Sequence, residues 1–375
     1  MTFSLPADPP HARSLTDVMP QLIAALDGRS EWFPPAASAI VFVIDGLGAH
    51  NLAARAGHAR FLTAAGGKKS VARTVFPSTT AAALTSLLTG TAPGEHGIVG
   101  YRVRVPETGD AVNQLKGWES DGLDPRSWQR RQPLLEREAA RGRPCFVVSR
   151  RAYAGSGFTE ATLRGAELVT AETLGERATL AADLAAAHPG ALVYLYAPEL
   201  DTVGHRLGWE SDEWAHALEG VDAASRALSD RLDPSTGVVV TADHGMIDVP
   251  RHRQLLLTDG DGLVDGVEII GGEPRMLHLY TAPGAAEDVA RAWRESESDR
   301  AWILTRDEAV GAGLFGRVED AVLPRIGDVL VAARAGVVYY DDRLDDKAAQ
   351  RMVGQHGSLT NEERVVPLIR LGAFA

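Results

Sequence analysis

The sequence contains one cysteine, Cys145, among its 375 residues. No internal disulfide can form, and the composition gives no sign of an oxidising compartment. Long apolar stretches are also missing, because no run reaches about 18 uninterrupted apolar residues. Residues 1–15 lack the apolar core of a signal peptide. These absences predict a cytoplasmic location without a membrane partner, and we expect Cys145 to be a small buried hydrophobe.

Positive charge is in deficit. The chain has 38 lysines and arginines against 50 aspartates and glutamates, and its formal net charge is −12 at pH 7. This balance disfavours a nucleic-acid polymer or an anionic membrane surface as the partner. A small anionic substrate would need local positive charge, which bound metal ions could supply. Nothing in the sequence indicates an oligomeric state.

Short apolar runs alternate with helical patterns along the chain. Runs rich in valine and isoleucine are typical of buried strands, and they occur at residues 39–44, 191–196 and 238–240. Amphipathic spacing predicts helices at residues 80–88, 174–187 and 213–232. The alternation predicts an α/β fold with a mostly parallel central sheet and helices on both faces. In such sheets ligands gather outside the carboxyl ends of the strands.

Two stretches break this alternation. Residues 250–353 are richer in turns and hold mixed strand and helix patterns, including a helix at 285–294. We interpret them as a smaller cap subdomain inserted into a single domain that spans residues 1–375. Residues 102–132 carry Pro106 and several glycines, which predicts an irregular loop near the site.

Four separated motifs follow or lie near the predicted strands. They are IDGLG with Asp45, YAPELDTVGHRLG with Asp201 and His205, TADHGM with Asp243 and His244, and GQHGS with His356. Three carboxylates and three imidazoles suit zinc or another first-row divalent ion better than calcium or magnesium. Asp201 and His205 lie four residues apart, so on a helix they would face one ion. Six ligands exceed the need of one tetrahedral ion and predict two ions.

Two neighbouring ions can hold the attacking and the leaving oxygen of an in-line displacement at phosphorus. The segment TVFPSTTAAALTSLLTG supplies the nucleophile that such a reaction needs. Three hydroxyl residues, Ser78, Thr79 and Thr80, precede its helix-forming run, and a helix N-terminus favours anions. A bound zinc ion could activate a threonine hydroxyl as it activates water.

The order of these motifs, together with PGEHGI at residues 93–98, resembles the alkaline phosphatase superfamily. Within it, the sequence resembles the nucleotide pyrophosphatase/phosphodiesterases, or type I phosphodiesterases, and is also similar to phosphonoacetate hydrolase. The joint order of the motifs is specific, although each motif alone is not. The resemblance implies an alkaline phosphatase-like catalytic domain. It also implies a hydrolase that cleaves phosphodiester or pyrophosphate bonds of small, nucleotide-like substrates through a phosphothreonine intermediate.

Carried over residue by residue, the resemblance implies two divalent metal ions, which we expect to be Zn²⁺. One ion would be bound by Asp201, His205 and His356. The other would be bound by Asp45, Asp243, His244 and the Thr80 oxygen. In the family the nucleophile stands ten residues before the glycine of the TG pair that precedes the HG motif. Gly90 therefore places the nucleophile at Thr80, with Thr79 as the alternative.

The sequence departs from the family pattern in two places. Relatives usually carry an asparagine after the HGI segment as a donor to the phosphate, whereas Tyr101 stands there in this chain. Because a phenol can also donate a hydrogen bond, Tyr101 is the candidate substrate-binding residue. Ala81, Ala82 and Ala83 replace the prolines and asparagines that commonly follow the nucleophile. This replacement predicts a smaller and more apolar pocket floor.

Other interpretations stay open. A phosphonoacetate-type phosphonate hydrolase would share the metals and the threonine but would need a lysine or arginine of the cap to hold the substrate carboxylate. A phosphomonoesterase fits the same motifs, and a sulfatase is disfavoured because no C/S-x-P-x-R signature lies around residue 80. From a different class, the chain could be a catalytically silent metal-binding interaction protein.

Several other residues carry weaker signals. Candidates to meet substrate charge or to stack on a base are Arg102, Arg104, Arg150, Arg151 and Tyr153. We expect His96 to tie its own loop through a ring hydrogen bond. Structural positions are expected for His50, His252 and His278.

Overall fold

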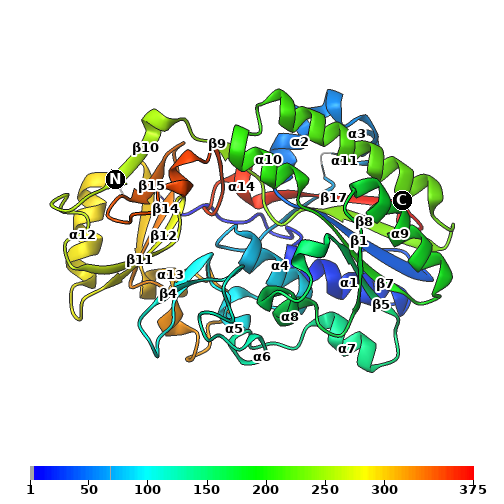
Figure 1. Ribbon diagram of the computed structural model, residues 1–375, viewed down its shortest axis with the longest axis horizontal. Helices are drawn as coiled ribbons and strands as arrows, with labels where there is room; N and C mark the ends of the chain where they lie inside the picture. The colour runs from blue at the N-terminus through cyan, green and yellow to red at the C-terminus, as the bar shows by residue number, and fades with distance from the viewer. Residues whose placement is uncertain (1–3, 68) are drawn as a thin grey trace.

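The computed structural model describes residues 4–67 and 69–375. A seven-stranded sheet forms the core of its larger part, at the right of Figure 1. Five adjacent strands, in the order β8–β1–β7–β5–β6, are all parallel, and β17 and β2 extend the sheet beyond β8 through antiparallel pairs. The strands are β1 (Ser38–Ile44), β2 (Val71–Arg73), β5 (Cys145–Ser149), β6 (Glu167–Thr170), β7 (Leu192–Ala197), β8 (Thr236–Thr241) and β17 (Val365–Gly372).

Helices cover both faces of this sheet (Figure 1). On one face α9 (Leu174–Ala187) packs on β1, β5 and β7, and α11 (Asp212–Arg231) packs on α9 and on α3 (Arg60–Ala65). On the other face α1 (Val18–Leu26) contacts β1, α7 (Leu134–Ala140) contacts β5, and α4 (Thr80–Thr89) packs on both helices. Every residue of β1, β7 and β8 is buried, as expected for strands covered on both sides. The predicted α/β fold is confirmed.

The remaining helices are mostly short. They are α2 (Ala49–Ala54), α5 (Pro93–His96), α6 (Pro125–Trp128), α8 (Gly157–Leu163), α10 (Glu199–Leu207), α12 (Ala286–Glu297), α13 (Arg306–Gly311) and α14 (Asn361–Arg364). Single 3-10 turns lie at Leu15–Asp17, Ala56–His58, Arg151–Tyr153, Arg251–Arg253, Leu323–Arg325 and Ala348–Arg351. Within the described residues, no helix combines the length and the hydropathy needed to cross a membrane. The cytoplasmic location stays a prediction.

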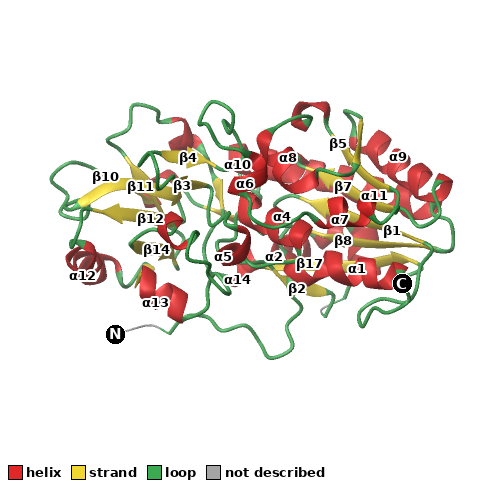
Figure 2. Ribbon diagram, turned by 90° about the horizontal axis from the view of Figure 1, so that it is seen from below, coloured by secondary structure: helices red, strands yellow, loops and turns green. Residues whose placement is uncertain are grey.

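A four-stranded antiparallel sheet lies at the other end of the molecule from the seven-stranded sheet (Figure 2). Its order is β11 (Val267–Glu273), β12 (Met276–Thr281), β14 (Val329–Ala333) and β13 (Ala301–Thr305). Helix α12 packs on this sheet through Trp293, over a hydrophobic cluster separate from the main core. These strands fall within the residues 250–353 that the sequence suggests as a cap. Their role as an inserted cap of a single catalytic domain stays a prediction.

Three two-stranded pairs complete the structure. β10 (Gln254–Leu257) pairs with β15 (Val338–Asp341), and β9 (Ile247–Asp248) pairs with β16 (Gly354–Gln355). β3 (Arg102–Arg104) and β4 (Ala111–Asn113) form a hairpin inside the stretch predicted as an irregular loop. That prediction was therefore too simple. The hairpin contacts β11, so the loop is built against the second sheet.

One buried ion pair joins the second sheet to the main part of the chain. Arg275, in the turn between β11 and β12, donates from Nε and Nη2 to the two oxygens of Glu363 in α14, both at 2.8 Å. Its remaining donors bond backbone carbonyls of Ala333, Ala335 and Val337. Both side chains are fully buried. A pair of this kind is costly to break because the surviving partner stays desolvated and unpaired.

We expect Arg275→Met to lower the free energy of unfolding by about 3–5 kcal/mol, because Glu363 would lose its buried partner. Urea unfolding followed by circular dichroism measures the loss. The control is Arg291→Met, which removes the exposed ion pair with Asp288 and should leave the urea midpoint unchanged. A loss of less than about 1 kcal/mol for Arg275→Met would show that the pair adds little to the junction.

Candidate metal centre

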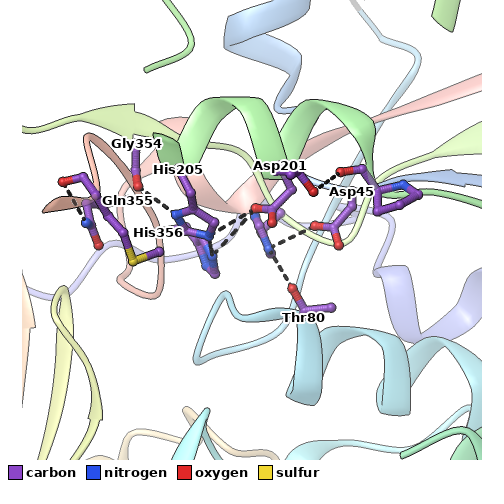
Figure 3. A network of polar contacts seen from close by, with 12 residues as sticks. Asp45, Thr80, Asp201, His205, Gly354, Gln355 and His356 are labelled. Atoms are coloured by element: carbon purple, nitrogen blue, oxygen red, sulfur yellow. Dashed lines mark hydrogen bonds and ion pairs between the residues drawn. The ribbon is translucent and has the colours of Figure 1, made fainter. Parts of the chain in front are cut away.

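Elements far apart in the sequence bring the predicted residues to one edge of the central sheet (Figure 3). Asp45 directly follows β1, and Asp243 lies just beyond the neighbouring strand β8. Helix α10 begins one residue after β7 and carries Asp201 and His205. The last ligand candidate, His356, follows β16, and Thr80 is the first residue of α4. The parallel strands thus deliver Asp45, Asp243 and the two side chains of α10 to their shared carboxyl edge, as expected.

Asp45, Asp243 and His244 form one group of potential ligands. The Nε2 atom of His244 lies 3.4 Å from Asp45 Oδ1 and 3.6 Å from Asp243 Oδ2. The Oγ1 atom of Thr80 lies 3.1 Å from the same nitrogen. All three ligand residues are buried, and their ligand atoms lie within 4.8 Å of one another. These are the residues that the resemblance assigns to one ion.

A second group adjoins the first. The Oδ1 atom of Asp201 lies 3.2 Å from His205 Nε2 and 4.0 Å from His356 Nε2. The two Nε2 atoms lie 3.3 Å apart. The rings of His244 and His356 stack with centroids 3.6 Å apart, and the ligand atoms of Asp201, His244 and His356 also lie within 4.8 Å of one another. His244 therefore lies between the two groups.

The backbone fixes which nitrogen each imidazole presents to the centre. The Nδ1 atoms of His205, His244 and His356 lie 2.8–3.1 Å from the carbonyl oxygens of Gly354, Gly245 and Ser78, respectively. A carbonyl only accepts, so each Nδ1 carries a hydrogen, and each ring in its neutral form turns an Nε2 lone pair inward. Burial and the neighbouring His244 and His205 hold the pKa of His356 well below its usual range. Facing lone pairs favour a cation between them.

The carboxylates also have atoms without a bonding partner at this centre. Three buried oxygens, Asp45 Oδ1, Asp201 Oδ1 and Asp243 Oδ2, have no hydrogen-bond partner among the residues that the structure describes. Their opposite oxygens are partly occupied: Tyr196 donates to Asp45 Oδ2, and the Gly46 amide donates to Asp243 Oδ1 at 3.1 Å. Burial, with the charges of Asp243 and Asp201, raises the pKa of Asp45 well above its usual range. This donor set fits divalent metal ions, which would neutralise it.

Two glycines allow the close packing that the centre requires. Gly46 has φ +75°, and a Cβ there would lie 3.1 Å from the Cα of Asp201. Gly245 follows His244, and a Cβ there would lie 2.0 Å from the carbonyl oxygen of Glu362. Any other residue at Gly245 would push the loop after β8 away from α14. The glycines of the IDGLG and DHG motifs therefore have a packing reason.

The structure separates the roles of the three candidate hydroxyls. Ser78 donates to the carbonyl of Ser358 at 2.7 Å and is buried. The Thr79 hydroxyl bonds the Glu273 carboxyl. Of these three hydroxyl groups, only that of Thr80 is hydrogen-bonded to a ligand candidate, His244. The geometry favours Thr80 over Thr79 as the reacting hydroxyl.

A cavity of about 800 Å³ opens beside Thr80, and Tyr101, Tyr153 and Lys116 line it. The arginines suggested as substrate contacts do not line this cavity; they are Arg102, Arg104, Arg150 and Arg151. Arg150 pairs with Glu199 at 2.7 Å, and Arg104 lies over the Tyr280 ring.

His96 and His278 are buried and bond local groups: His96 Nε2 lies 2.9 Å from Ser86 Oγ, and His278 Nδ1 accepts from Gly327. Cys145 is buried, as predicted.

Comparison with known proteins identifies the family. The model of the type I phosphodiesterase / nucleotide pyrophosphatase family matches residues 39–359. The chain belongs to this family. A curated relative, an ectonucleotide pyrophosphatase/phosphodiesterase of Caenorhabditis elegans, is 26% identical over 296 residues, which are 75% of this chain and 33% of the relative. The chain thus spans about a third of that relative's length, and the family predicted from the motifs is confirmed.

Solved structures show the same fold. Murine ectonucleotide pyrophosphatase / phosphodiesterase 5 has a TM-score of 0.68 at 17% identity, covering 88% of this chain and 87% of that one. Phosphonoacetate hydrolase from Sinorhizobium meliloti, in complex with phosphonoformate, has a TM-score of 0.69 at 19% identity, covering 90% and 91%. A further structure holds an inactive threonine-to-alanine variant of the murine protein with AMP.

Sequence reasoning missed two residues of this family member's centre. Tyr196, in β7, donates a hydrogen bond to Asp45, but a tyrosine in an apolar strand gives no signal of such a role. Glu273, at the end of β11, lines the cavity although its strand belongs to the second sheet. A Cβ on Gly357 would lie 2.6 Å from Glu273 Cγ, so the loop after His356 packs directly on this carboxyl. Because Glu273 and Gly357 lie far apart in the sequence, no local pattern predicts this contact.

We expect Asp45→Asn to raise the melting temperature of the chelator-treated protein, because the buried carboxyl that burial and the charges of Asp243 and Asp201 disfavour in its ionised form is removed. The same change should remove most of the stabilisation that zinc gives the wild type. Differential scanning fluorimetry with and without zinc measures both effects. Asp248→Asn, outside both ligand groups, should keep the wild-type zinc shift, and an unchanged zinc shift in Asp45→Asn would contradict the assignment.

Glu273 gives a pH-dependent prediction. Burial raises its pKa from 4.5 to about 8. Between these values the folded protein keeps a proton that the unfolded chain releases, so this contribution to stability is complete below pH 4.5 and is lost as the pH rises toward 8. Metal-free Glu273→Gln should therefore gain about 2 kcal/mol or more over the wild type between pH 5 and pH 9 in urea unfolding. Stability curves of Glu273→Gln and the wild type that stay parallel from pH 5 to pH 9 would contradict this prediction.

Proposed function

We propose that the chain is a hydrolase with two metal ions that cleaves phosphodiester or pyrophosphate bonds of small substrates, with Thr80 as the nucleophile. One observation carries the proposal. Unpartnered carboxylate oxygens and inward-facing imidazole nitrogens converge beside a threonine hydroxyl at a helix N-terminus. Membership of the type I phosphodiesterase / nucleotide pyrophosphatase family supports it.

The ligand assignment follows the two groups. Asp201, His205 and His356 would hold one ion, and Asp45, Asp243, His244 and the Thr80 oxygen would hold the other. The mixture of carboxylates and imidazoles at a buried site favours zinc. When bound, two ions neutralise the phosphoryl oxygens and favour the alkoxide form of the threonine hydroxyl.

The chain's own groups orient the substrate. Thr79 precedes α4 without a side-chain cap, so amide groups of the first turn of α4 stay available for phosphoryl oxygens. Tyr101 lines the same cavity and can donate one hydrogen bond. Thr80 Oγ1 attacks phosphorus, its bond to phosphorus forms as the bond to the leaving-group oxygen breaks, and water then hydrolyses the phosphothreonine.

Phosphonate hydrolysis is the second candidate, and Lys116 is the observation that favours it. Lys116 lines the cavity, where its cation could hold a substrate carboxylate. Phosphonoacetate hydrolase has the same fold, and its structure holds phosphonoformate, a carboxylated phosphonate. A cavity of about 800 Å³ exceeds the need of so small a substrate, and we therefore rank an organic phosphodiester first.

We expect Thr80→Ala to lower kcat/KM for bis-p-nitrophenyl phosphate by about a thousandfold or more, because Thr80 is the only one of the three candidate hydroxyls at the start of α4 that bonds a ligand candidate. Thr80→Ser should keep part of the activity, and Thr79→Ala should stay within about tenfold of the wild type. Zinc-supplemented assays against p-nitrophenyl phosphate and phosphonoacetate separate diester, monoester and phosphonate cleavage. Full activity of Thr80→Ala would reject the nucleophile, and zinc binding without turnover would indicate a silent binding protein.

A further inference from the structure

One end of the cavity beside Thr80 is formed by α10, by the end of β11 and by the segment that leads to His356. The residues that line this end are Thr202, Glu273, Pro274, Ala349, Met352 and Gln355. Tyr340, in β15, joins two of them, because it accepts from Gln355 Nε2 at 3.0 Å and donates to the Ala349 carbonyl at 2.8 Å. We call the part of the cavity that these six residues line the Glu273 end.

The Glu273 carboxyl is held on one side and free on the other. The residue is 7% exposed, and its carboxyl bonds the Thr79 hydroxyl. Its Oε1 atom has no hydrogen-bond partner among the residues that the structure describes. A buried oxygen without a partner is costly, and most such atoms in folded proteins are satisfied. Because this carboxyl lines the cavity, a substrate group can supply the missing hydrogen bond.

The other polar side chains of the Glu273 end have already used their hydrogens. Thr202 donates its hydroxyl hydrogen to the Pro198 carbonyl at 2.9 Å. The Gln355 Nε2 atom donates to the Tyr340 hydroxyl and, at 3.4 Å, to the Met352 carbonyl. The six residues of this end therefore offer acceptors and no free side-chain donor. They suit a ligand group that carries an O–H or N–H, and they give no partner to a group that carries only acceptors.

The Glu273 end adjoins the ligand group that does not contain the nucleophile. Thr80 bonds His244 of the first group, and in a two-metal in-line displacement the attacking and the leaving oxygen lie at different ions. Glu273 packs on the loop of the second group, because a Cβ on Gly357, which follows His356, would lie 2.6 Å from Glu273 Cγ. In Figure 3, Gln355 lies beyond His356 on the side away from Asp45. The leaving group would therefore meet the Glu273 end.

An anionic leaving group finds no positive charge at this end. Ionised pyrophosphate carries several negative charges and only acceptors. Outside the ligand candidates, Lys116 is the only cation among the described residues that line the cavity. Its loop packs through Trp118 on Gly157, at the start of α8, where a Cβ would lie 2.4 Å from the Trp118 Cβ. Lys116 thus enters the cavity from the α8 side, whereas Glu273 enters from the second sheet.

We propose that Glu273 selects the leaving group, because its free oxygen accepts a hydrogen bond from a second hydroxyl of the departing alcohol. The preferred substrates are then phosphodiesters of an uncharged polyol, and nucleoside triphosphates, which lose pyrophosphate, are poor substrates. The inference rests on the proposed function and specifies its leaving group. As the bond from Thr80 Oγ1 to phosphorus forms, the polyol oxygen departs with the electron pair of its bond and takes up the threonine proton or one from solvent. Glu273 is unchanged by the reaction.

Three substrates that differ only in the leaving group test the proposal. They are the glyceryl ester and the propyl ester of thymidine 5′-phosphate, and thymidine 5′-triphosphate. Each releases thymidine 5′-phosphate, which chromatography quantifies. The zinc-loaded protein is assayed at pH 9, above the pKa of about 8 that burial gives Glu273, so that the carboxyl is ionised. Because the substrates differ in intrinsic reactivity, each variant is compared with the wild type on the same substrate.

We expect Glu273→Gln to lower kcat/KM about tenfold for the glyceryl ester, to change the propyl ester by less than about twofold, and to raise the triphosphate about tenfold, because an amide donor replaces the free acceptor. Glu268→Gln, the same change at an exposed position of β11, should alter none of the three values. Equal losses on all three substrates would show that Glu273 only holds Thr79 in place, and no change at all would also overturn the proposal. If Glu273→Gln fails to fold, Glu273→Ala should lower the glyceryl-to-propyl ratio about tenfold.

Equilibrium binding separates this proposal from the proposed function. The glyceryl and propyl esters are titrated by calorimetry into zinc-loaded Thr80→Ala and into the double variant that also carries Glu273→Gln, which needs no turnover. Binding of the glyceryl ester about tenfold tighter in Thr80→Ala, with the preference lost in the double variant, would support the role of Glu273 even if no ester were cleaved. Equal affinities in Thr80→Ala would reject it even if the wild type proved to be an active phosphodiesterase.

Discussion

The constraint on which this structure depends is the convergence of three carboxylates on one small space, two of them buried and the third, Asp201, half-buried. Asp45, Asp201 and Asp243 each turn an unpartnered oxygen toward the same space. Water cannot screen their repulsion there, and each desolvated charge is costly. The fold nevertheless holds them in place, through strands β1 and β8 and helix α10. A protein bears such an arrangement when cations complete it, and the three inward-facing imidazole nitrogens point to the same requirement.

The second sheet contributes to this centre by holding the loop that carries His356. Ser358 donates to the Ala333 carbonyl of β14 at 2.6 Å and accepts at its own carbonyl from Ser78, two residues before the proposed nucleophile. Its amide bonds Glu363, the buried partner of Arg275. The ion pair at the junction, the loop of His356 and the segment leading into α4 are therefore one continuous network. Displacement of the second sheet would therefore move the candidate metal ligand His356 and the proposed nucleophile Thr80 together.

Sequence reasoning reached the fold class and the set of residues at the centre because both leave local signals. Apolar runs mark the buried strands, and the spacing of Asp201 and His205 fits one helix face. It missed β5, β6 and the antiparallel strands β2 and β17. Runs such as Cys145–Ser149 end in no chemically distinctive motif, and β17 contains Pro367 and Arg370. Sequence reasoning also chose arginines that do not line the cavity and missed Glu273 and Tyr196. The positions of all these residues depend on contacts between segments far apart in the chain, which leave no local pattern.

The central claim, that this chain holds two metal ions at one centre, is tested most directly by counting them. Zinc-loaded protein is passed through a desalting column, its bound zinc is measured by mass spectrometry, and crystals are examined for anomalous scattering at the zinc edge. We predict two zinc ions per chain and two anomalous peaks, one near Asp45, Asp243 and His244 and one near Asp201, His205 and His356. A single ion, or none, retained at this centre would contradict the account.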